Sequence, residues 1–334
     1  MRATDIPLEI LGTGEYVPAT RISSEELDRG WSKTVGWSQR ATGVASRAYA
    51  GAGETVVTMG AAAATRALQA ANMQASQLDA ILCVGSVPYQ AIPCTAAFLQ
   101  HALGLQDSGI PAFDVNATCL GFLAAIDLVS QGIATGRYRS VLIVASECVS
   151  LGLHTDDHAT AALFGDGAGA AVIGAARREG AVLRASHLQT FSAGLTFCQI
   201  RAGGSGLTPR EDWQGYLKAT AFEMQGPQTY RLARQLLPQF MATLLDRARV
   251  DASDIDVWIP HQASGRAIEH LQGVLGLPPE RLVITLDTLG NQVSASLPIA
   301  LHRGIASGAI RPGHKIALVG SGAGLSLGGM VLSV

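Results

Sequence analysis

The chain has 334 residues, of which 48% are hydrophobic and only 15% are charged, and its formal net charge is −2. This length suits one large α/β unit or about two domains, and the near-neutral charge leaves no global field that would attract nucleic acid or an anionic membrane. The five cysteines are odd in number and form no Cys-x-x-Cys pair, which argues against a disulfide framework or a structural zinc site.

The N-terminal stretch and the hydropathy of the chain predict its location in the cell. The stretch Met1–Pro7 lacks a basic segment followed by an apolar one, and no apolar run is long enough to cross a bilayer. We therefore expect a cytoplasmic protein without membrane insertion.

Two pairs of stretches repeat in the same order along the chain. Residues 71–82 match residues 248–259, each with a helix end, a serine-containing turn and a strand. Residues 132–144 match residues 304–319 as helix, glycine, turn and strand. Because both pairs are displaced by nearly the same distance, we expect two similar α/β halves, residues 1–177 and residues 178–334.

One cysteine in the first half lies between two predicted elements. Residues 113–118 predict a buried strand, and residues 120–128 predict an apolar helix with Leu120, Leu123, Ala124 and Leu128 at helical spacing. Cys119 then lies in the first turn of a helix, where free N–H groups and the helix dipole stabilise a thiolate. A thiolate is a nucleophile, so Cys119 is a candidate covalent catalyst. The alternative is a small buried core residue.

The second half begins with a turn-rich stretch at residues 178–222, where residues 202–209 predict a loop. A helix is expected from Tyr230 to Arg249, kinked or interrupted by Pro238. His261 follows a predicted strand at residues 257–260, and regular pairing is expected to stop at Pro260.

Two further strand ends carry polar groups. Asn291 follows a predicted short strand at residues 282–285 and a glycine that permits a tight turn. Residues 320–324 form a small-residue turn that can present bare N–H groups. If the halves pack about a pseudo-two-fold axis, a thiol, an imidazole, an amide and oxyanion donors converge, which favours an enzyme.

The chain resembles the thiolase-like condensing enzymes along its whole length, most closely the β-ketoacyl-ACP synthase III group. The resemblance lies in residues 11–18, 112–122, 164–170, 260–263 and 286–291, and in the glycine-rich end near Gly322. It implies a thiolase-like fold with α-β-α-β-α layers, a homodimer, and a catalytic triad of Cys119, His261 and Asn291.

The resemblance also implies a reaction. Cys119 takes an acyl group from acyl-CoA, and malonyl-ACP then loses carbon dioxide and attacks the acyl thioester, giving a 3-oxoacyl-ACP in fatty-acid or related lipid biosynthesis. The implied oxyanion donors are the backbone N–H groups of Cys119 and Ala323. No metal or redox cofactor is expected, because a thioester carbonyl already stabilises the carbanion; the partners are acyl-CoA and acyl carrier protein.

The implied substrate-binding positions keep the family's residues at some places and change them at others. Trp37, Gly226 and Arg266 match the family, whereas Ala41 and His158 stand where it has arginines, Ser264 where it has asparagine and Ile92 where it has phenylalanine. These changes spare the triad, so we expect weak use of acetyl-CoA and a longer acyl donor, or a donor delivered on a carrier protein.

Two alternatives remain open at this point. A related acyltransferase or condensing enzyme of secondary metabolism could use the same cysteine and histidine with a different acceptor. An inactive partner subunit is the non-enzyme alternative, and the joint presence of Cys119, His261 and Asn291 argues against it.

Overall fold

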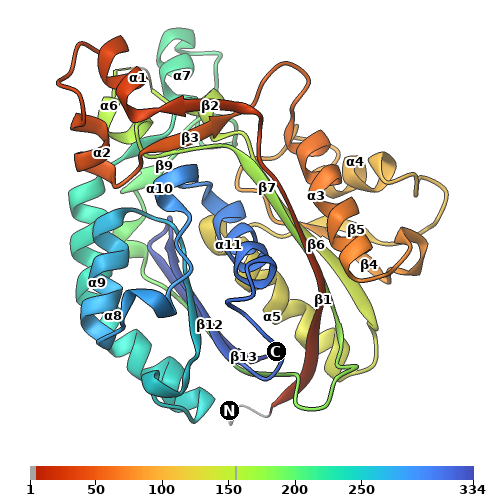
Figure 1. Cartoon of the computed structure of the whole chain (residues 1–334). Helices are drawn as coiled ribbons and strands as arrows, with labels where there is room; N and C mark the ends of the chain where they lie inside the picture. The colour runs from red at the N-terminus through yellow and green to blue at the C-terminus, as the bar shows by residue number, and fades with distance from the viewer. Residues whose placement is uncertain (1–4, 155) are drawn as a thin grey trace.

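The computed structural model describes residues 5–154 and 156–334. The first four residues, part of the stretch inspected for a signal segment, lie outside it. Nine strands are hydrogen-bonded side by side in one series (Figure 1). The series has two parts, here called wings, which meet where β1 (Ile6–Tyr16) pairs with β8 (Val182–Thr190) through only two residue pairs.

Four strands of each wing share one pairing pattern, and the first wing has one strand more. The first wing has β4 parallel to both β5 and β6, then antiparallel β7 and β1; the second has β11 parallel to β12, then antiparallel β13 and β8. The strands of the first wing are β5 (Ala112–Asp114), β4 (Ala80–Cys83), β6 (Ser140–Glu147), β7 (Gly167–Ala175) and β1 (Ile6–Tyr16). Those of the second are β11 (Val257–Pro260), β12 (Lys315–Gly322), β13 (Ser326–Ser333) and β8 (Val182–Thr190).

Three pairs of helices complete the layers (Figure 1). The outer pairs are α3 (Val56–Ala70) with α4 (Thr95–Ala102), and α8 (Gly226–Ala248) with α9 (Gly265–Leu275). Between the wings lie α5 (Gly121–Ala134) and α11 (Ser296–Ala306), and each of these two contacts strands of both wings. This is the expected α-β-α-β-α arrangement.

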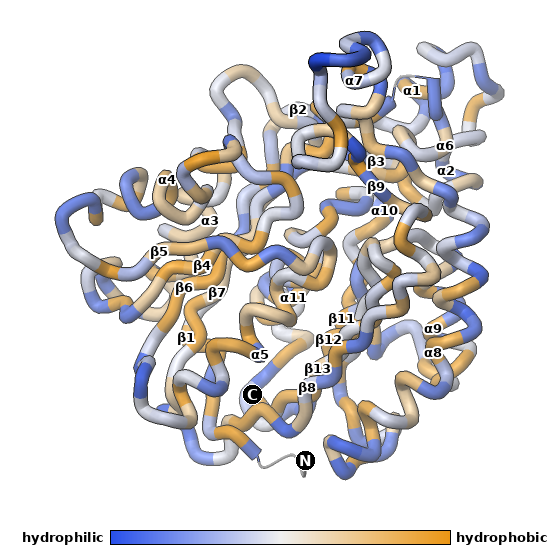
Figure 2. The backbone as a smooth tube through the Cα atoms, turned by 180° about the vertical axis from the view of Figure 1, so that it is seen from behind, coloured by the Kyte–Doolittle hydropathy of each residue, from blue (hydrophilic) through white to orange (hydrophobic). Residues whose placement is uncertain are grey.

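The central position of α5 follows from its composition, because a helix that is apolar on nearly all sides is stable only when surrounded by other elements. Phe122, Leu123 and Ile126 are fully buried in the largest core cluster. Leu128 is the exception: we expected it on the buried face, but it is 56% exposed. Figure 2 shows the contrast between the orange central elements and the mixed surface of α8 and α9.

The structure confirms the elements of both repeats. The helices α3 and α8 each end before a short 3-10 turn, η1 (Ala75–Gln77) and η5 (Ala252–Asp254), that leads into β4 and β11. Asn72 and Arg249 even share a left-handed backbone at the same point, with φ of 51° and 55°. The boundary at residues 177 and 178 falls in the connection from β7 to β8 and stays a prediction.

Three local expectations were wrong or partly wrong. The strand β5 is short and lies at the edge of the sheet, so Phe113 is 40% exposed rather than buried. Residues 282–285 form no strand but a single parallel bridge between Leu282 and Trp258. Pro238 lies within α8 without interrupting it. Regular pairing stops at Pro260 as expected, because Pro260 with Val319 is the last register pair of β11 and β12.

Small elements cover one end of the layers, at the top of Figure 1. They are β2 (Thr20–Ser23), β3 (Ser46–Tyr49), α1 (Ser24–Gly30), α2 (Trp37–Thr42), α6 (His158–Ala161), α7 (Trp213–Ala219), β9 (Cys198–Gln199), β10 (Glu223–Met224) and α10 (Leu286–Leu289). The expected loop at residues 202–209 is confirmed. Within the described residues, no helix combines the length and the apolar character needed to span a membrane.

Candidate active site

Cys119 lies on a tight elbow between β5 and α5. The 3-10 turn η2 (Thr118–Leu120) is closed by a hydrogen bond from the N–H of Leu120 to the carbonyl of Ala117. Thr118 has φ of +51°, a conformation that costs energy for a residue with a Cβ. Its N–H donates to Oδ1 of Asn116 at 2.9 Å, which holds the turn.

Two backbone N–H groups, those of Ala323 and of Cys119 itself, act to lower the pKa of the Cys119 thiol. They are the groups that the sequence predicts as oxyanion donors, and that role stays a prediction. Burial first, and then the nearby Glu147 and Cys198, nevertheless raise the pKa of this thiol to about 12. The expected stabilised thiolate is therefore wrong for this structure, because desolvation outweighs the donors.

His261 emerges from the end of β11 and is 4% exposed. Burial lowers the pKa of its imidazole to about 4, so the ring is neutral at pH 7. Nδ1 is buried without a hydrogen-bond partner in the described part of the chain. A neutral imidazole can accept a proton at one nitrogen and donate one from the other.

Asn291 lies beside His261 at the start of a second elbow. Its Oδ1 accepts from the N–H of Val293 at 2.9 Å. Nδ2 donates one N–H to the carbonyl of Ala263 at 3.4 Å, and the N–H of Ala263 donates to the carbonyl of His261. Asn291 is thus connected to the backbone turn that carries His261.

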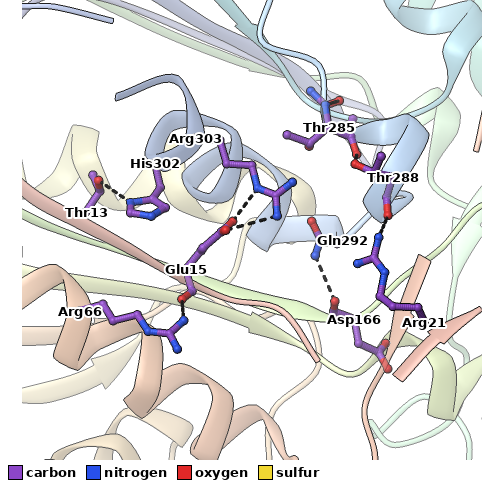
Figure 3. A network of polar contacts seen from close by, with 11 residues as sticks. Thr13, Glu15, Arg21, Arg66, Asp166, Thr285, Thr288, Gln292, His302 and Arg303 are labelled. Atoms are coloured by element: carbon purple, nitrogen blue, oxygen red, sulfur yellow. Dashed lines mark hydrogen bonds and ion pairs between the residues drawn. The ribbon is translucent and has the colours of Figure 1, made fainter. Parts of the chain in front are cut away.

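Polar contacts fix the C-terminal elbow to the first wing (Figure 3). Nε2 of Gln292, the residue after Asn291, donates to the carbonyl of Asp166 at 3.0 Å. Helix α11 is joined to β1 by the ion pair of Arg303 with Glu15, 2.8 Å between Nε and Oε2. Figure 3 shows these contacts on one side of α11.

Two glycines of β12 let His261 and the turn of Cys119 pack closely against the strand. A Cβ on Gly320 would lie 2.6 Å from Cβ of His261 and 3.3 Å from Cδ2 of Leu120. A Cβ on Gly322 would lie 2.8 Å from Oγ1 of Thr118. The turn η2 also contacts η7 (Val293–Ala295), the 3-10 turn that follows Asn291. The structure therefore places the turn of Cys119 against β12 beside His261, and against the turn that follows Asn291.

A small, mainly apolar cavity of about 70 Å³ reaches His261 from between α8 and α9. Cys119 is not among the residues that line it, which include Tyr230, Leu237, Phe240, His261, Ile268 and Leu271.

Two family models match the chain. The model described as 3-oxoacyl-[acyl-carrier-protein (ACP)] synthase III covers residues 113–192, and the model of its C terminal part covers residues 245–334. A β-ketoacyl-[acyl-carrier-protein] synthase III of Neisseria meningitidis is 33% identical over 324 residues, 97% of this chain and 98% of the relative. The chain belongs to the 3-oxoacyl-ACP synthase III family.

Other members of the synthase III family are similarly close. An acetoacetyl CoA synthase of a Streptomyces species is 35% identical over 97% of each chain. The solved 3-oxoacyl-(acyl carrier protein) synthase III of Pseudomonas aeruginosa superposes with a TM-score of 0.88 at 31% identity, covering 98% of each chain. The chain is accordingly an acyltransferase with the thiolase-like fold.

Five of the six expected substrate-binding residues lie in two regions of the fold, one at α2 and α6 and the other at the starts of α8 and α9. Trp37 and His158 lie on α2 and α6, two short helices in contact. Gly226 begins α8, Ser264 caps α9 by accepting from the N–H of Ala267, and Arg266 is exposed in the first turn of α9.

Two of these residues behave in ways that the sequence did not indicate. The ring of His158 is stacked on Trp31, with centroids 4.6 Å apart. Ile92 is 83% exposed on the loop between β4 and α4, and it lines no cavity of its own chain among those described.

Three residues around the site were missed by sequence reasoning: Asn116, Glu147 and Gly320. Glu147 ends β6, where burial raises the pKa of its carboxyl, and its Oε1 accepts from Ser294 Oγ at 2.6 Å and from the Ser86 N–H at 2.8 Å. A signal existed for Asn116, because the spacing Asn-x-x-Cys at residues 116–119 recurs as Asn-x-x-Ser at residues 291–294.

Proposed function

We propose that this synthase III family member performs a decarboxylative Claisen condensation with Cys119 as the acyl carrier. The observation that carries the proposal is the placement of two N–H donors at the Cys119 thiol, in an elbow packed against the β12 glycines beside His261. The two N–H groups can stabilise the oxyanion of the acyl thioester, and His261 can donate to the enolate of a malonyl thioester.

In the first half-reaction, the sulfur of Cys119 attacks the carbonyl carbon of the acyl-CoA thioester. Its proton passes to the imidazole of His261, which is available as an acceptor because its lowered pKa keeps the ring neutral at pH 7. The N–H groups of Cys119 and Ala323 stabilise the tetrahedral oxyanion. The C–S bond to CoA breaks, CoA leaves as a thiol after taking up the proton, and acyl-Cys119 remains.

In the second half-reaction, a malonyl thioester loses carbon dioxide and becomes an enolate. Neutral N–H donors from His261 and from Nδ2 of Asn291 stabilise the enolate oxygen. The enolate carbon attacks acyl-Cys119, the C–S bond breaks, and the thiolate of Cys119 takes up a proton from solvent. No metal or redox cofactor enters, because the thioester carbonyl delocalises the carbanion.

The exposed surface around α2, α6 and the start of α9 is where the carrier of the thioester binds in this proposal. Arg266 is an exposed cation there, suited to a phosphate of phosphopantetheine or of CoA. Trp37 and the His158–Trp31 stack offer aromatic faces. Gly226 and Ser264 lie at the starts of α8 and α9, toward the site.

A homodimer across the edge strand β5 completes the proposal. This strand pairs only with β4 among the described strands, and exposed apolar side chains lie on it and on the loop between β4 and α4: Phe113, Val87, Tyr89 and Ile92. An unprotected edge with apolar neighbours favours pairing with a second copy. Because Ile92 is exposed in its own chain, it can line an acyl pocket only in the partner.

The five free cysteines suit the reducing cytoplasm.

Intact mass spectrometry after incubation with acyl-CoA tests the nucleophile. We expect one acyl group per chain, mapped to Cys119 and lost in Cys119→Ala. An adduct on Cys83, Cys94, Cys148 or Cys198 instead would refute the assignment. His261→Ala and Asn291→Ala should each slow malonyl decarboxylation about 10²- to 10³-fold while leaving acylation partly intact.

A second acceptor is favoured by one observation. The Streptomyces relative, as similar to this chain as the others, is named an acetoacetyl CoA synthase. Release of carbon dioxide from malonyl-ACP and from malonyl-CoA, compared at equal concentrations, separates the two carriers.

A further inference from the structure

The two elbows of the molecule have the same construction. In the first, the N–H of Thr118 donates to Oδ1 of Asn116 at 2.9 Å. In the second, the N–H of Val293 donates to Oδ1 of Asn291 at 2.9 Å. Thr118 and Val293 both have φ of +51°, and a 3-10 turn leads from each into a central helix, α5 or α11.

This correspondence assigns Asn116 a place in the site. Asn116 is the counterpart of Asn291, and Cys119 is the counterpart of Ser294. The amide of Asn291 donates from Nδ2 to the carbonyl of Ala263 at 3.4 Å, two residues after His261. The amide of Asn116 donates from Nδ2 to the carbonyl of Ser86 at 3.2 Å, so both of its ends also hold backbone.

The hydrogen bond to Thr118 acts on the group that reacts. A left-handed Thr118 is strained, and the hydrogen bond offsets part of that cost. The peptide between Thr118 and Cys119 carries the N–H that points at the thiol. The conformation of Thr118 therefore sets the direction of this N–H and the position of the Cys119 sulfur.

Hydrogen bonds connect Ser86, the residue that accepts from Asn116, to the other half of the molecule. Ser86, whose carbonyl accepts from Asn116, donates its own N–H to Oε1 of Glu147. The same oxygen accepts from Ser294 on the second elbow. One buried carboxyl thus ties the elbow of Cys119 to the elbow that follows Asn291.

We propose that Asn116 is a positioning residue for the acylation half-reaction, because it holds Thr118 in the left-handed conformation that aims the Cys119 N–H at the oxyanion. The inference rests on the proposed function of Cys119 and adds a residue to it. Asn116 touches neither the thiol nor the substrate in this role, and it does not serve the decarboxylation, which uses the opposite elbow.

Three variants test the proposal. Asn116→Ala removes the acceptor for the Thr118 N–H, whereas Asn116→Ser keeps a neutral oxygen that can accept the same N–H more weakly. Asn72→Ala is the matched control: Asn72 is another exposed asparagine, itself at φ of 51° but remote in sequence from the elbows. This control lowers stability through backbone strain without touching the site.

The readouts separate the two half-reactions. Single-turnover acylation of Cys119 is followed by intact mass, and malonyl decarboxylation is measured in a Cys119→Ala background with and without Asn116→Ala. We expect Asn116→Ala to slow acylation roughly 5- to 10-fold, the effect of one lost hydrogen bond. Asn116→Ser should recover at least half of the loss on a logarithmic scale, and decarboxylation in the Cys119→Ala background should not change.

Several outcomes overturn the inference. Parental acylation in Asn116→Ala would remove the positioning role. Equal losses in acylation and decarboxylation, or a loss in Asn72→Ala as large as in Asn116→Ala, would show a general effect of stability. A Cys119→Ala protein that does not decarboxylate malonyl thioesters contradicts the proposed roles of His261 and Asn291 instead, so the two failures are distinguishable.

Discussion

Replacing Gly320 by alanine tests whether β12 sets the position of His261. The added Cβ would lie 2.6 Å from Cβ of His261 and 3.3 Å from Cδ2 of Leu120. Carbon atoms in contact prefer about 3.5–4.0 Å, so His261 has to move by about 1 Å. The clash meets a Cβ atom rather than the end of a flexible side chain, so rotation of a side-chain tip does not relieve it.

A misplacement of about 1 Å at a reacting group can cost on the order of 10²-fold in rate, and overpacking a core typically costs about 1–3 kcal/mol of stability. We therefore expect Gly320→Ala to slow malonyl decarboxylation at least tenfold while the protein remains folded by circular dichroism. Gly273→Ala is the matched control, since a Cβ there meets nothing within 4 Å. Decarboxylation at the parental rate in a folded Gly320→Ala protein would refute this account of the site.

Three further outcomes follow from burial and from the substrate positions. Because burial raises the pKa of Cys119 to about 12, its alkylation by iodoacetamide, mapped by peptide mass, should still rise with pH beyond 9; a plateau centred below pH 8 would restore the thiolate expected from the sequence. The pKa of His261 is about 4 in the fold against 6.5 when exposed, so its contribution to stability is complete above pH 6.5 and is lost as pH falls toward 4. That loss is on the order of 3 kcal/mol, and chemical denaturation should show a shallower decline for His261→Gln. In competition for Cys119, octanoyl-CoA should outcompete acetyl-CoA, since each buried methylene contributes about 0.8 kcal/mol; a clear preference for acetyl-CoA would count against the longer acyl donor.

The positions of the proposed catalytic residues were predictable from sequence because each lies at a junction of local elements. A strand followed by an apolar helix places Cys119, a strand end places His261, and Gly290 introduces the turn before Asn291 with φ of 69°. The repeats were predictable for the same reason, since helix ends and turns are written in short stretches of chain.

Features that depend on distant neighbours could not be predicted in this way. The pKa of Cys119 depends on desolvation by elements packed against its turn, among them β12 and η7, so the local argument from a helix terminus gave the wrong direction. The exposure of Phe113 depends on β5 having a neighbour on one side only. The role of Glu147 depends on two loops that meet from opposite halves, which no local pattern contains.

Burial that opposes a thiolate is consistent with the chemistry that such a site has to perform. The same desolvation that raises the pKa of Cys119 lowers that of His261, so both groups are neutral at pH 7 and the proton is transferred only as attack proceeds. A neutral imidazole remains available as an N–H donor for the enolate over the physiological pH range. Exclusion of water also protects an acyl thioester from hydrolysis until a carbon nucleophile arrives. A more exposed cysteine would ionise more readily, and its acyl group would be lost to water more readily as well.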